Sequence, residues 1–550
     1  MEEIMKKLSR VVLGSVCTVL AAAALLTGCK KNESKVVAGD ENTPGWSIPE
    51  NVKQKVKFDW YVNFSWFARH WGDSKVSKYI TEKTGVDINF IVPAGNEAEK
   101  LNTMIAGDVL PDLITLGWYE GQVPLMIDSG YVCALDELAE QYDPYFFKAA
   151  NAQKLNWYRQ KDGHVYGYPN ASFTPSDYEK YAGKLTSNET FLVRKDLYET
   201  LGRPDMSTPE GFLKALRNAK AMFPKVNGQN LIPFGTTEFS DVGCSQLQAT
   251  LAHFLAISPE EDGKYVDVNL GLTENPEYLR WLKVLRTAYQ EKLLTKEMFI
   301  DKRSQIEEKA SNGRYFCMLY QNWDMQTAQN TLYANDPDSI YIAVPGPKNS
   351  KGDDPVLAGG GISGWTITMI SKKCKDKGKA IQFLTYLISE EGQMDTNFGI
   401  QGETWEYDEN GVPCLLPEIR ALDSENKNRQ ETEIGVQYTY WMLMDTAWQT
   451  QFPVEYAPSL GQPQLWTVPY VHSYAVYDGL TIPSGSDEDL IYADIQRKWG
   501  KVLPDLIQAR SDEEFDEIVA EFNAYKRSKG IDKVQKLQTK LMNENKLKLR

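Results

Sequence analysis

Apolar and polar positions alternate along several short stretches of the chain, and this period of about two residues is typical of β-strands. Between these stretches apolar positions recur every three to four residues, which is typical of amphipathic helices. The pattern predicts strands at 56–62, 86–92, 113–116, 163–168, 191–194, 314–320 and 364–370. It predicts helices at 74–84, 96–106, 135–142, 208–223 and 379–393. Helical patterning dominates 246–309, and the last part of the chain is predicted to be mostly helical and loop.

Strands that alternate with helices predict an α/β architecture in which mostly parallel sheets are covered by helices on both faces. Ligands of such sheets bind beyond the carboxyl ends of the strands. Asn63 and Trp66 follow the first predicted strand, and Trp118, Tyr119 and Glu120 follow the third. We therefore expect these two groups of side chains to face one crevice.

Length and composition indicate more than one folding unit. The body that begins near Val52 is too long for one small domain, so two or more lobes are expected. The chain holds 14 Trp and 29 Tyr, more than cores alone require. A net charge of −15 argues against nucleic acid as a partner, because nucleic-acid binding needs a basic surface.

The first thirty residues have the pattern of a secretory signal. Lys6, Lys7 and Arg10 precede an apolar run, 11–26, which is shorter than the roughly 20 residues that span a membrane. The run ends in Leu-Thr-Gly-Cys at 26–29, which resembles the lipobox of bacterial lipoproteins. An ordinary secretion signal with an incidental cysteine is the alternative interpretation.

The lipobox resemblance implies that residues 1–28 are a signal peptide and are removed. Cys29 then becomes the N-terminus and carries acyl chains, including palmitate. These chains anchor the protein to the outer face of the cell membrane, which we expect to be a Gram-positive cell surface. The polar stretch 29–51 is predicted to be a flexible tether with a reach of about 25 Å. The basic stretch 526–550 is interpreted as a solvated helical end, with a contact to anionic lipid or wall polymer as the alternative.

The motifs of metal, nucleotide and nucleophilic chemistry are missing from the sequence. The cysteines are scattered, with no CxxC or Cys/His cluster, so we expect neither a metal site nor a disulfide framework. Residues 359–364 match GxGxxG, but a strand follows where the dinucleotide motif needs a helix, so we interpret them as an inter-lobe turn. The acidic stretch 423–426 lacks the glycine of a calcium loop. We expect no cofactor.

A series of short motifs resembles one known family. Over residues 55–410 their order is similar to that of bacterial extracellular solute-binding proteins of the sugar-binding group, family 1, including the lipoproteins that feed polysaccharide uptake. The segments that carry the resemblance are Met104–Asp112, Gly130–Asp136, Asp162–Pro169, Arg194–Leu197, Asn312–Met318, Lys379–Leu384, Ser389–Gln393 and Phe398–Trp405.

The resemblance implies a two-lobed, periplasmic-binding-protein-like fold of class II, with discontinuous lobes joined by hinge strands. We expect the N-terminal lobe to comprise 52–168 and 318–374, and the C-terminal lobe 169–317 and 375–550. The implied function is that of a monomeric receptor of an ABC importer, which binds an oligosaccharide between the lobes and delivers it to membrane permeases without catalysis.

Saccharides present flat C–H faces to aromatic rings and hydroxyl groups to polar side chains. Trp323 with Asp324, after the predicted strand 314–320, is the preferred ligand-binding pair, because the family commonly places a stacking aromatic there. Trp118, Tyr119 and Glu120 form the second group. The secondary candidates are Asn63, Trp66, Trp365 and Trp405. Aromatic residues that could extend the platform from the unmatched region are Trp441, Trp448, Trp466 and Tyr470.

Two other functions are compatible with the sequence. A surface glycan hydrolase would need a pair of carboxylates about 5–9 Å apart, and the 75 acidic residues permit many pairs. A sensor that presents its closed, ligand-bound form to a membrane kinase would share the site of a transport receptor.

Overall fold

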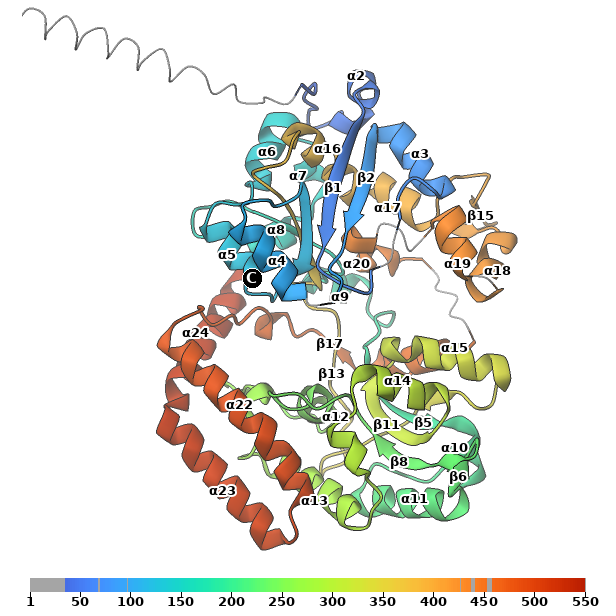
Figure 1. Ribbon diagram of the computed structural model, residues 1–550, viewed down its shortest axis with the longest axis vertical. Helices are drawn as coiled ribbons and strands as arrows, with labels where there is room; N and C mark the ends of the chain where they lie inside the picture. Colours follow the sequence, from blue (N-terminus) through green and yellow to red (C-terminus); the bar gives the residue numbers. More distant parts are fainter. Residues whose placement is uncertain are drawn as a thin grey trace, which may run out of the picture.

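The computed structural model describes residues 35–67, 70–95, 97–425, 427–436, 441–452 and 458–549. The signal peptide predicted at 1–28 and the acylation site predicted at Cys29 lie outside these residues. The described residues form two lobes, each built around its own sheet (Figure 1).

The sheet of the first lobe has the strand order β2-β1-β3-β14-β4. The first three strands are parallel, and β14 pairs antiparallel with both β3 and β4. Every residue of β3 and of β14 is buried, because helices cover both faces of the sheet. The strand bounds are β1 Val56–Val62, β2 Val86–Ile91, β3 Leu113–Gly117, β4 Tyr168–Pro169 and β14 Thr366–Ile370.

The helices of the first lobe begin and end at residues suited to those places. Ser74 caps α3 by accepting a hydrogen bond from the N–H of Ser77, and Gly85 ends it with a φ of 75°. The helices are α2 Pro49–Lys53, α3 Lys75–Thr84, α4 Glu97–Ala106, α5 Gln122–Asp128, α6 Leu135–Tyr142, α7 Phe146–Ala149, α8 Ala152–Tyr158, α16 Lys377–Ile388, α17 Glu390–Asn397, α18 Pro417–Glu425, α19 Lys427–Arg429 and α20 Thr446–Gln449.

The sheet of the second lobe has the strand order β12-β5-β11-β8. Strand β11 is central: it pairs parallel with β8 and antiparallel with β5. All six residues of β5 are buried, as they are in a strand covered on both faces. The strand bounds are β5 Glu189–Arg194, β8 Ile232–Gly235, β11 Tyr315–Gln321 and β12 Tyr341–Ala343.

Three long helices at the end of the chain, drawn in orange and red in Figure 1, lie along one side of the second lobe. The C-terminal end of α24 reaches the first lobe, where the Lys548 ammonium lies 5.4 Å from the ring centroid of Trp157. The helices of this lobe are α10 Lys195–Thr200, α11 Pro209–Met222, α12 Leu251–Phe254, α13 Pro276–Gln290, α14 Arg303–Ser311, α15 Gln326–Asn335, α21 Gly461–Thr467, α22 Asp487–Gln508, α23 Asp512–Lys529 and α24 Ile531–Lys548.

The chain passes from the first lobe to the second after β4, through a segment that contains α9 (Pro175–Lys180). It returns before β14 and crosses again between α20 and α21. Two short strands, β13 (Leu357–Ala358) and β17 (Val471–His472), pair beside the returning segment. The lobes are therefore discontinuous in sequence.

The lobe boundaries in the structure differ from those drawn on the sequence. Residues 318–321 lie in β11, in the second sheet, although 318–374 was assigned to the first lobe. Helices α16 and α17 belong to the first lobe, where Ile381 and Leu384 lie in its core, although 375–550 was assigned to the second. Strands buried on both faces are uniformly apolar, so their sequences do not specify to which sheet they belong.

The end of the stretch predicted to be a tether is packed against the first lobe. The Trp46 indole is 2% exposed, and Asn51 Nδ2 donates to the carbonyl oxygens of Val37 and Gly45. Gln382, on α16, also donates to Val37 O. A flexible tether over the whole of 29–51 is therefore wrong for residues 37–51, which the buried indole and these hydrogen bonds hold in place.

Two predicted elements have different limits. Of the strand predicted at 163–168, only Tyr168 joins the sheet, as part of β4. The helix predicted at 379–393 is interrupted at Ser389, whose side chain accepts from the N–H of Gly392 and begins α17. No helix within the described ranges is long and apolar enough to cross a membrane. The five described cysteines are all free thiols.

Candidate functional site

A hydrogen-bonded chain of side chains lies at the carboxyl edge of the first sheet. The Tyr61 hydroxyl donates to Asn63 Oδ1 over 2.7 Å, and Asn63 Nδ2 donates to Glu120 Oε2 over 2.6 Å. The other oxygen of Glu120 accepts from the N–H of Gly117 at 2.8 Å. Asn63 and Glu120 follow adjacent parallel strands, β1 and β3, which is why they meet.

Burial and a second carboxylate shape the electrostatics of this edge. Partial burial raises the pKa of Glu120, the N–H of Gly117 and the Asn63 amide lower it, and the nearby charge of Glu97 raises it. Glu97 Oε1 accepts from both the N–H and the hydroxyl of Ser65, at 2.7 and 3.0 Å. The pKa of Tyr119, beside Glu120, is also raised, first by burial and then by the same two carboxylates.

Three aromatic rings, those of Phe64, Trp66 and Trp365, form a cluster that we call the tryptophan platform. The indoles of Trp66 and Trp365 are stacked, with centroids 6.0 Å apart and an interplanar angle of 16°. The Phe64 ring lies 5.1 Å from that of Trp365 and 5.5 Å from that of Trp66. Trp66 is 51% exposed, so the cluster presents an aromatic surface to solvent.

Trp118 connects the Glu120 edge to the platform. Its Nε1 donates to Gly364 O at 3.1 Å, and its backbone N–H donates to Trp365 O. The neighbouring Tyr119 ring meets the Trp118 ring edge-on, with centroids 5.9 Å apart, and is 60% exposed. Eight of the nine predicted ligand-binding residues thus fall into two groups, one in each lobe. The residues described so far form the first group.

The second group lies at the carboxyl end of β11. Trp323 is 50% exposed, and its backbone N–H donates to Asn188 Oδ1. Asp324 accepts from Arg303 Nη2 at 3.0 Å, and Arg303 also donates to Glu307 through Nε at 2.8 Å. Burial raises the pKa of Asp324, whereas Arg303 lowers it.

Asp324 and Arg303 line a cavity of about 300 Å³ at the carboxyl ends of β8 and β11. Its wall is rich in hydroxyl, amide and carboxylate groups. The polar residues of the wall include Thr237, Glu238, Ser240, Ser245, Gln248, Asn269, Tyr320, Gln321 and Gln496. Such a wall can hydrogen-bond a ligand with many hydroxyl groups.

The two groups lie on facing edges of the lobes. In Figure 1 strands β1 and β2 run from α2 toward the second lobe, so the carboxyl ends of the first sheet point at that lobe. The carboxyl end of β11 lies beside the crossing segments, because Asn322 donates to Ser187 O and Ser187 donates to Ala358 O. We call the two edges together the inter-lobe site.

Trp405 is not part of the inter-lobe site. Its indole is 6% exposed, packs against Phe398 and Tyr407, and donates through Nε1 to Gly399 O. These contacts are those of a packed side chain, so its prediction as a ligand-binding residue is not supported by its surroundings. Trp466 likewise stacks on Phe254 at the second core, with centroids 6.2 Å apart.

The glycine-rich stretch 359–364 lies in the segment that returns to the first lobe. Gly360 O accepts from the Tyr178 hydroxyl, and Gly364 has a φ of 69°. A Cβ on Gly364 would lie 2.0 Å from Asn170 O, so the close approach of the two crossing segments requires glycine there. The residues thus form a tight inter-lobe turn, as the following strand β14 indicated.

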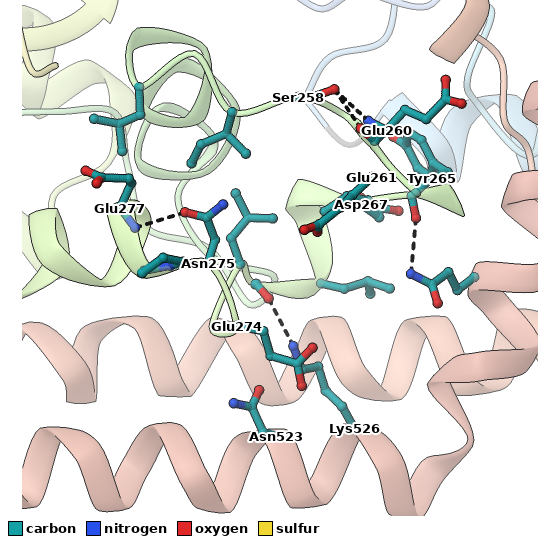
Figure 2. A pocket seen from close by; sticks show the side chains of 18 of the residues that line it. Ser258, Glu260, Glu261, Tyr265, Asp267, Glu274, Asn275, Glu277, Asn523 and Lys526 are labelled. Carbon is teal, nitrogen blue, oxygen red and sulfur yellow. Dashed lines mark hydrogen bonds between the residues drawn. The ribbon is translucent and has the colours of Figure 1, made fainter. Parts of the chain in front are cut away.

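A separate cavity of about 660 Å³ lies between the second lobe and helices α23 and α24 (Figure 2). Its polar side chains mostly bond each other: Lys526 Nζ donates to Gly271 O and Thr273 Oγ1, and Gln538 Nε2 donates to Asp267. None of the residues predicted to bind ligand lines it. Because many polar groups of this cavity are already hydrogen-bonded within the protein, we place the functional site at the inter-lobe edges, where the Trp66, Tyr119 and Trp323 side chains are exposed.

Several residues of the site were not predicted from the sequence. Tyr61 lies within a strand and has no motif of its own. Arg303 begins α14 and meets Asp324 only in the folded lobe, 21 positions further on. Its position at the start of a helix carries no signal of a ligand-facing role.

The chain belongs to the bacterial extracellular solute-binding proteins, because the model of that family matches residues 75–402. Within the described ranges, no group of three or more His, Cys, Asp or Glu side chains is arranged to hold a metal ion. A curated relative, an uncharacterized protein of Niallia circulans, is 27% identical over 169 residues, which are 30% of this chain and 63% of the relative.

Solved structures confirm the predicted two-lobed α/β fold. The alginate-binding protein AlgQ2, without calcium, superposes with a TM-score of 0.61 at 18% identity, over 90% of this chain and 99% of that one. The substrate-binding protein FusA of a Streptococcus pneumoniae ABC transporter, in complex with kestose, superposes with a TM-score of 0.63 at 20% identity. The superposition covers 90% of this chain and 100% of FusA. An extracellular solute-binding protein of Bifidobacterium longum subsp. infantis superposes with a TM-score of 0.63 at 14% identity, over 89% of this chain and 98% of that one.

Membership of this family also decides between two of the functions that the sequence left open. The family is one of extracellular solute-binding proteins, so the chain is a binding protein and not a glycan hydrolase.

Proposed function

We propose that this protein is the oligosaccharide receptor of an ABC importer, and that it binds its ligand at the inter-lobe site without changing it. The observation that carries the proposal is the stack of the exposed Trp66 indole on the half-buried Trp365 indole, close to the carboxylate of Glu120. Aromatic faces stack on the apolar faces of sugar rings, and carboxylate oxygens accept from sugar hydroxyls.

The second lobe supplies a complementary surface. Trp323 offers a further exposed ring, and the cavity beside Asp324 is lined by hydroxyl and amide groups. A ligand held between two lobes that close on it contacts both surfaces at once, and hinge closure around ligands is the usual motion of such folds. Relatives of the same fold include an alginate-binding protein and a protein in complex with kestose, which supports a saccharide as the ligand.

The proposal includes the location of the receptor. Cys29 carries the acyl chains, residues 1–28 are removed, and the protein acts as a monomer on the outer face of the membrane beside its permeases. Two acyl chains hold a protein stably at a bilayer, whereas one holds it only marginally. The chain is held against the first lobe from about residue 37, where Val37 exchanges hydrogen bonds with Asn51.

A thermal-shift screen over oligosaccharides tests the function. A ligand present at 100 times its dissociation constant stabilises the folded protein by about 2.7 kcal/mol, which raises the unfolding midpoint. We expect at least one oligosaccharide to do so, with binding confirmed by calorimetry and the recovered sugar unchanged by chromatography. Stabilisation by peptides or other solutes, with none by any saccharide, would contradict the proposed ligand class.

A further inference from the structure

Two carboxylates, those of Glu97 and Glu120, lie at the first edge of the inter-lobe site. The charge of Glu97 raises the pKa of Glu120. The charges of both carboxylates also raise the pKa values of Tyr61 and Tyr119, in addition to the effect of burial. Among the described residues, neither Glu97 nor Glu120 forms an ion pair with a lysine or arginine. A ligand on the tryptophan platform therefore meets negative charge from this side.

The second edge of the inter-lobe site is also negatively charged. Arg303 is the basic residue in the wall of the 300 Å³ cavity, and it is already bound to two carboxylates, Asp324 at 3.0 Å and Glu307 at 2.8 Å. Glu238 is a third carboxylate in the wall of this cavity, and its charge raises the pKa of Asp324. One guanidinium, bonded to two of these three carboxylates, leaves this edge negative as well.

Geometry makes the same carboxylates good acceptors for neutral hydroxyls. Each oxygen of Glu120 accepts one N–H from the protein, from Gly117 or from Asn63, so each keeps a further lone pair. Asn63 is in turn held by Tyr61, so the Glu120 carboxylate is fixed before the ligand arrives. Hydroxyl donors would find these acceptors in place, whereas an anionic group would find no lysine or arginine paired with them among the residues that the structure describes.

We propose that the inter-lobe site takes uncharged oligosaccharides and excludes saccharides that carry carboxylates. The inference rests on the proposed function, and it adds the chemical class of the ligand. Juxtaposed like charges oppose binding strongly, whereas the same carboxylates accept hydrogen bonds from neutral sugars. The selectivity therefore comes from Glu97 and Glu120 on one side and from Glu238 and Asp324 on the other.

Matched pairs of ligands test this selectivity. Oligogalacturonates, oligoglucuronates and oligomannuronates of equal length are compared with their carboxyl-reduced products, which keep the linkage and lose only the charge. Affinities are measured by calorimetry at about 20 mM and about 500 mM sodium chloride, because salt screens charge repulsion at exposed groups. The full mature chain is used throughout.

We expect the reduced member of a binding pair to bind about tenfold or more tightly than the uronate at low salt, with a smaller ratio at high salt. Glu120→Gln should reduce the ratio of the two affinities, reduced ligand over uronate. Glu97→Gln provides a second variant should the first unfold. Glu517→Gln, which neutralises an exposed carboxylate on α23, should leave the ratio unchanged.

The outcomes separate the two proposals. A uronate that binds as tightly as its reduced partner, or more tightly, overturns the selectivity while the oligosaccharide function stands. A ratio that neither salt nor the two glutamate variants change also overturns it, since charge would not be its cause. If no member of any pair binds and the wider oligosaccharide screen is also negative, the proposed function fails and the selectivity fails with it.

Discussion

The indoles of Trp66 and Trp365 stack at a centroid distance of 6.0 Å, although the two residues come from distant parts of the chain. Trp66 follows β1, and Trp365 immediately precedes β14 on the segment that returns from the second lobe. The platform is therefore built partly from the segment that crosses between the lobes.

Replacement of Trp66 by alanine should weaken oligosaccharide binding by about 1 to 2 kcal/mol, roughly tenfold, because the exposed stacking face is lost. The unfolding midpoint should change little, since half of the side chain is in solvent. Calorimetric titration measures the affinity. Tyr407→Ala removes a similarly exposed ring on β15 (Trp405–Tyr407) and should leave affinity unchanged; an equal loss in both variants would contradict the platform.

The Tyr61 hydroxyl is predicted to act on binding through Asn63. Tyr61→Phe removes the hydrogen bond to Asn63 Oδ1 and leaves the buried ring, so the amide is no longer held with its nitrogen toward Glu120. We expect a loss of affinity of about threefold to tenfold. If Asn63→Ala loses the same affinity and the double variant loses no more, Tyr61 contributes to binding through Asn63. Additive losses of affinity would show that the two residues contribute separately.

The stability of the first lobe should depend on the ionisation of Asp143. This buried carboxylate accepts from the N–H of Gly45, and burial raises its pKa to about 6. Because the folded protein holds the proton more tightly than the unfolded chain, the contribution of this group to stability is fully present below about pH 4 and is lost as the pH rises through 6. The expected loss from this group is about 3 kcal/mol.

Asp143→Asn keeps an acceptor for Gly45 and removes the ionisation. The unfolding midpoint of the natural chain should therefore fall relative to that of the variant between pH 4 and pH 7. Parallel midpoint curves over this range would show that Asp143 is not the titrating group.

Gly364 should not tolerate a side chain. Gly364→Ala adds a Cβ 2.0 Å from Asn170 O at a φ of 69°. Gly352→Ala is the matched control, because Gly352 has a φ of 77° and nothing lies within 4 Å of its added Cβ. Both variants carry the cost of a positive φ, about 1 kcal/mol, so the additional fall in the unfolding midpoint of Gly364→Ala measures the clash between the crossing segments. Equal midpoints would contradict the close approach.

Cys29→Ser should release the protein from the membrane without changing its affinity for oligosaccharide. Cell fractionation followed by immunoblotting measures the release, and calorimetry on the released protein measures the affinity. Uptake of the ligand by cells should fall, because the receptor is no longer held beside its permeases. A variant that stays in the membrane fraction would contradict acylation at this residue.

Strong local patterns predicted much of the fold. The alternation at 56–62 and the apolar period at 135–142 have the same limits as β1 and α6. The break at Ser389 carried a signal that the long apolar run obscured, namely a capping serine followed by Glu390 and Glu391. Trp46 was missed because a polar, glycine- and proline-rich stretch does not reveal one buried indole.

The candidate site was predictable only where strand order places residues together. Asn63 and Glu120 follow neighbouring parallel strands, and such neighbours meet at one edge. The Arg303–Asp324 pair depends on how α14 packs beside β11, which no local pattern specifies. Trp405 was misleading because the composition of a motif does not distinguish an exposed indole from a packed one.

The measurement that tests the central claim most directly is a crystal structure of the protein with an oligosaccharide identified in the thermal-shift screen. The account predicts a sugar ring against the Trp66–Trp365 pair, with hydroxyls within hydrogen-bonding distance of Glu120 and of the Asp324 edge. A saccharide bound instead in the 660 Å³ cavity beside α23 and α24, with the inter-lobe site empty, would contradict it.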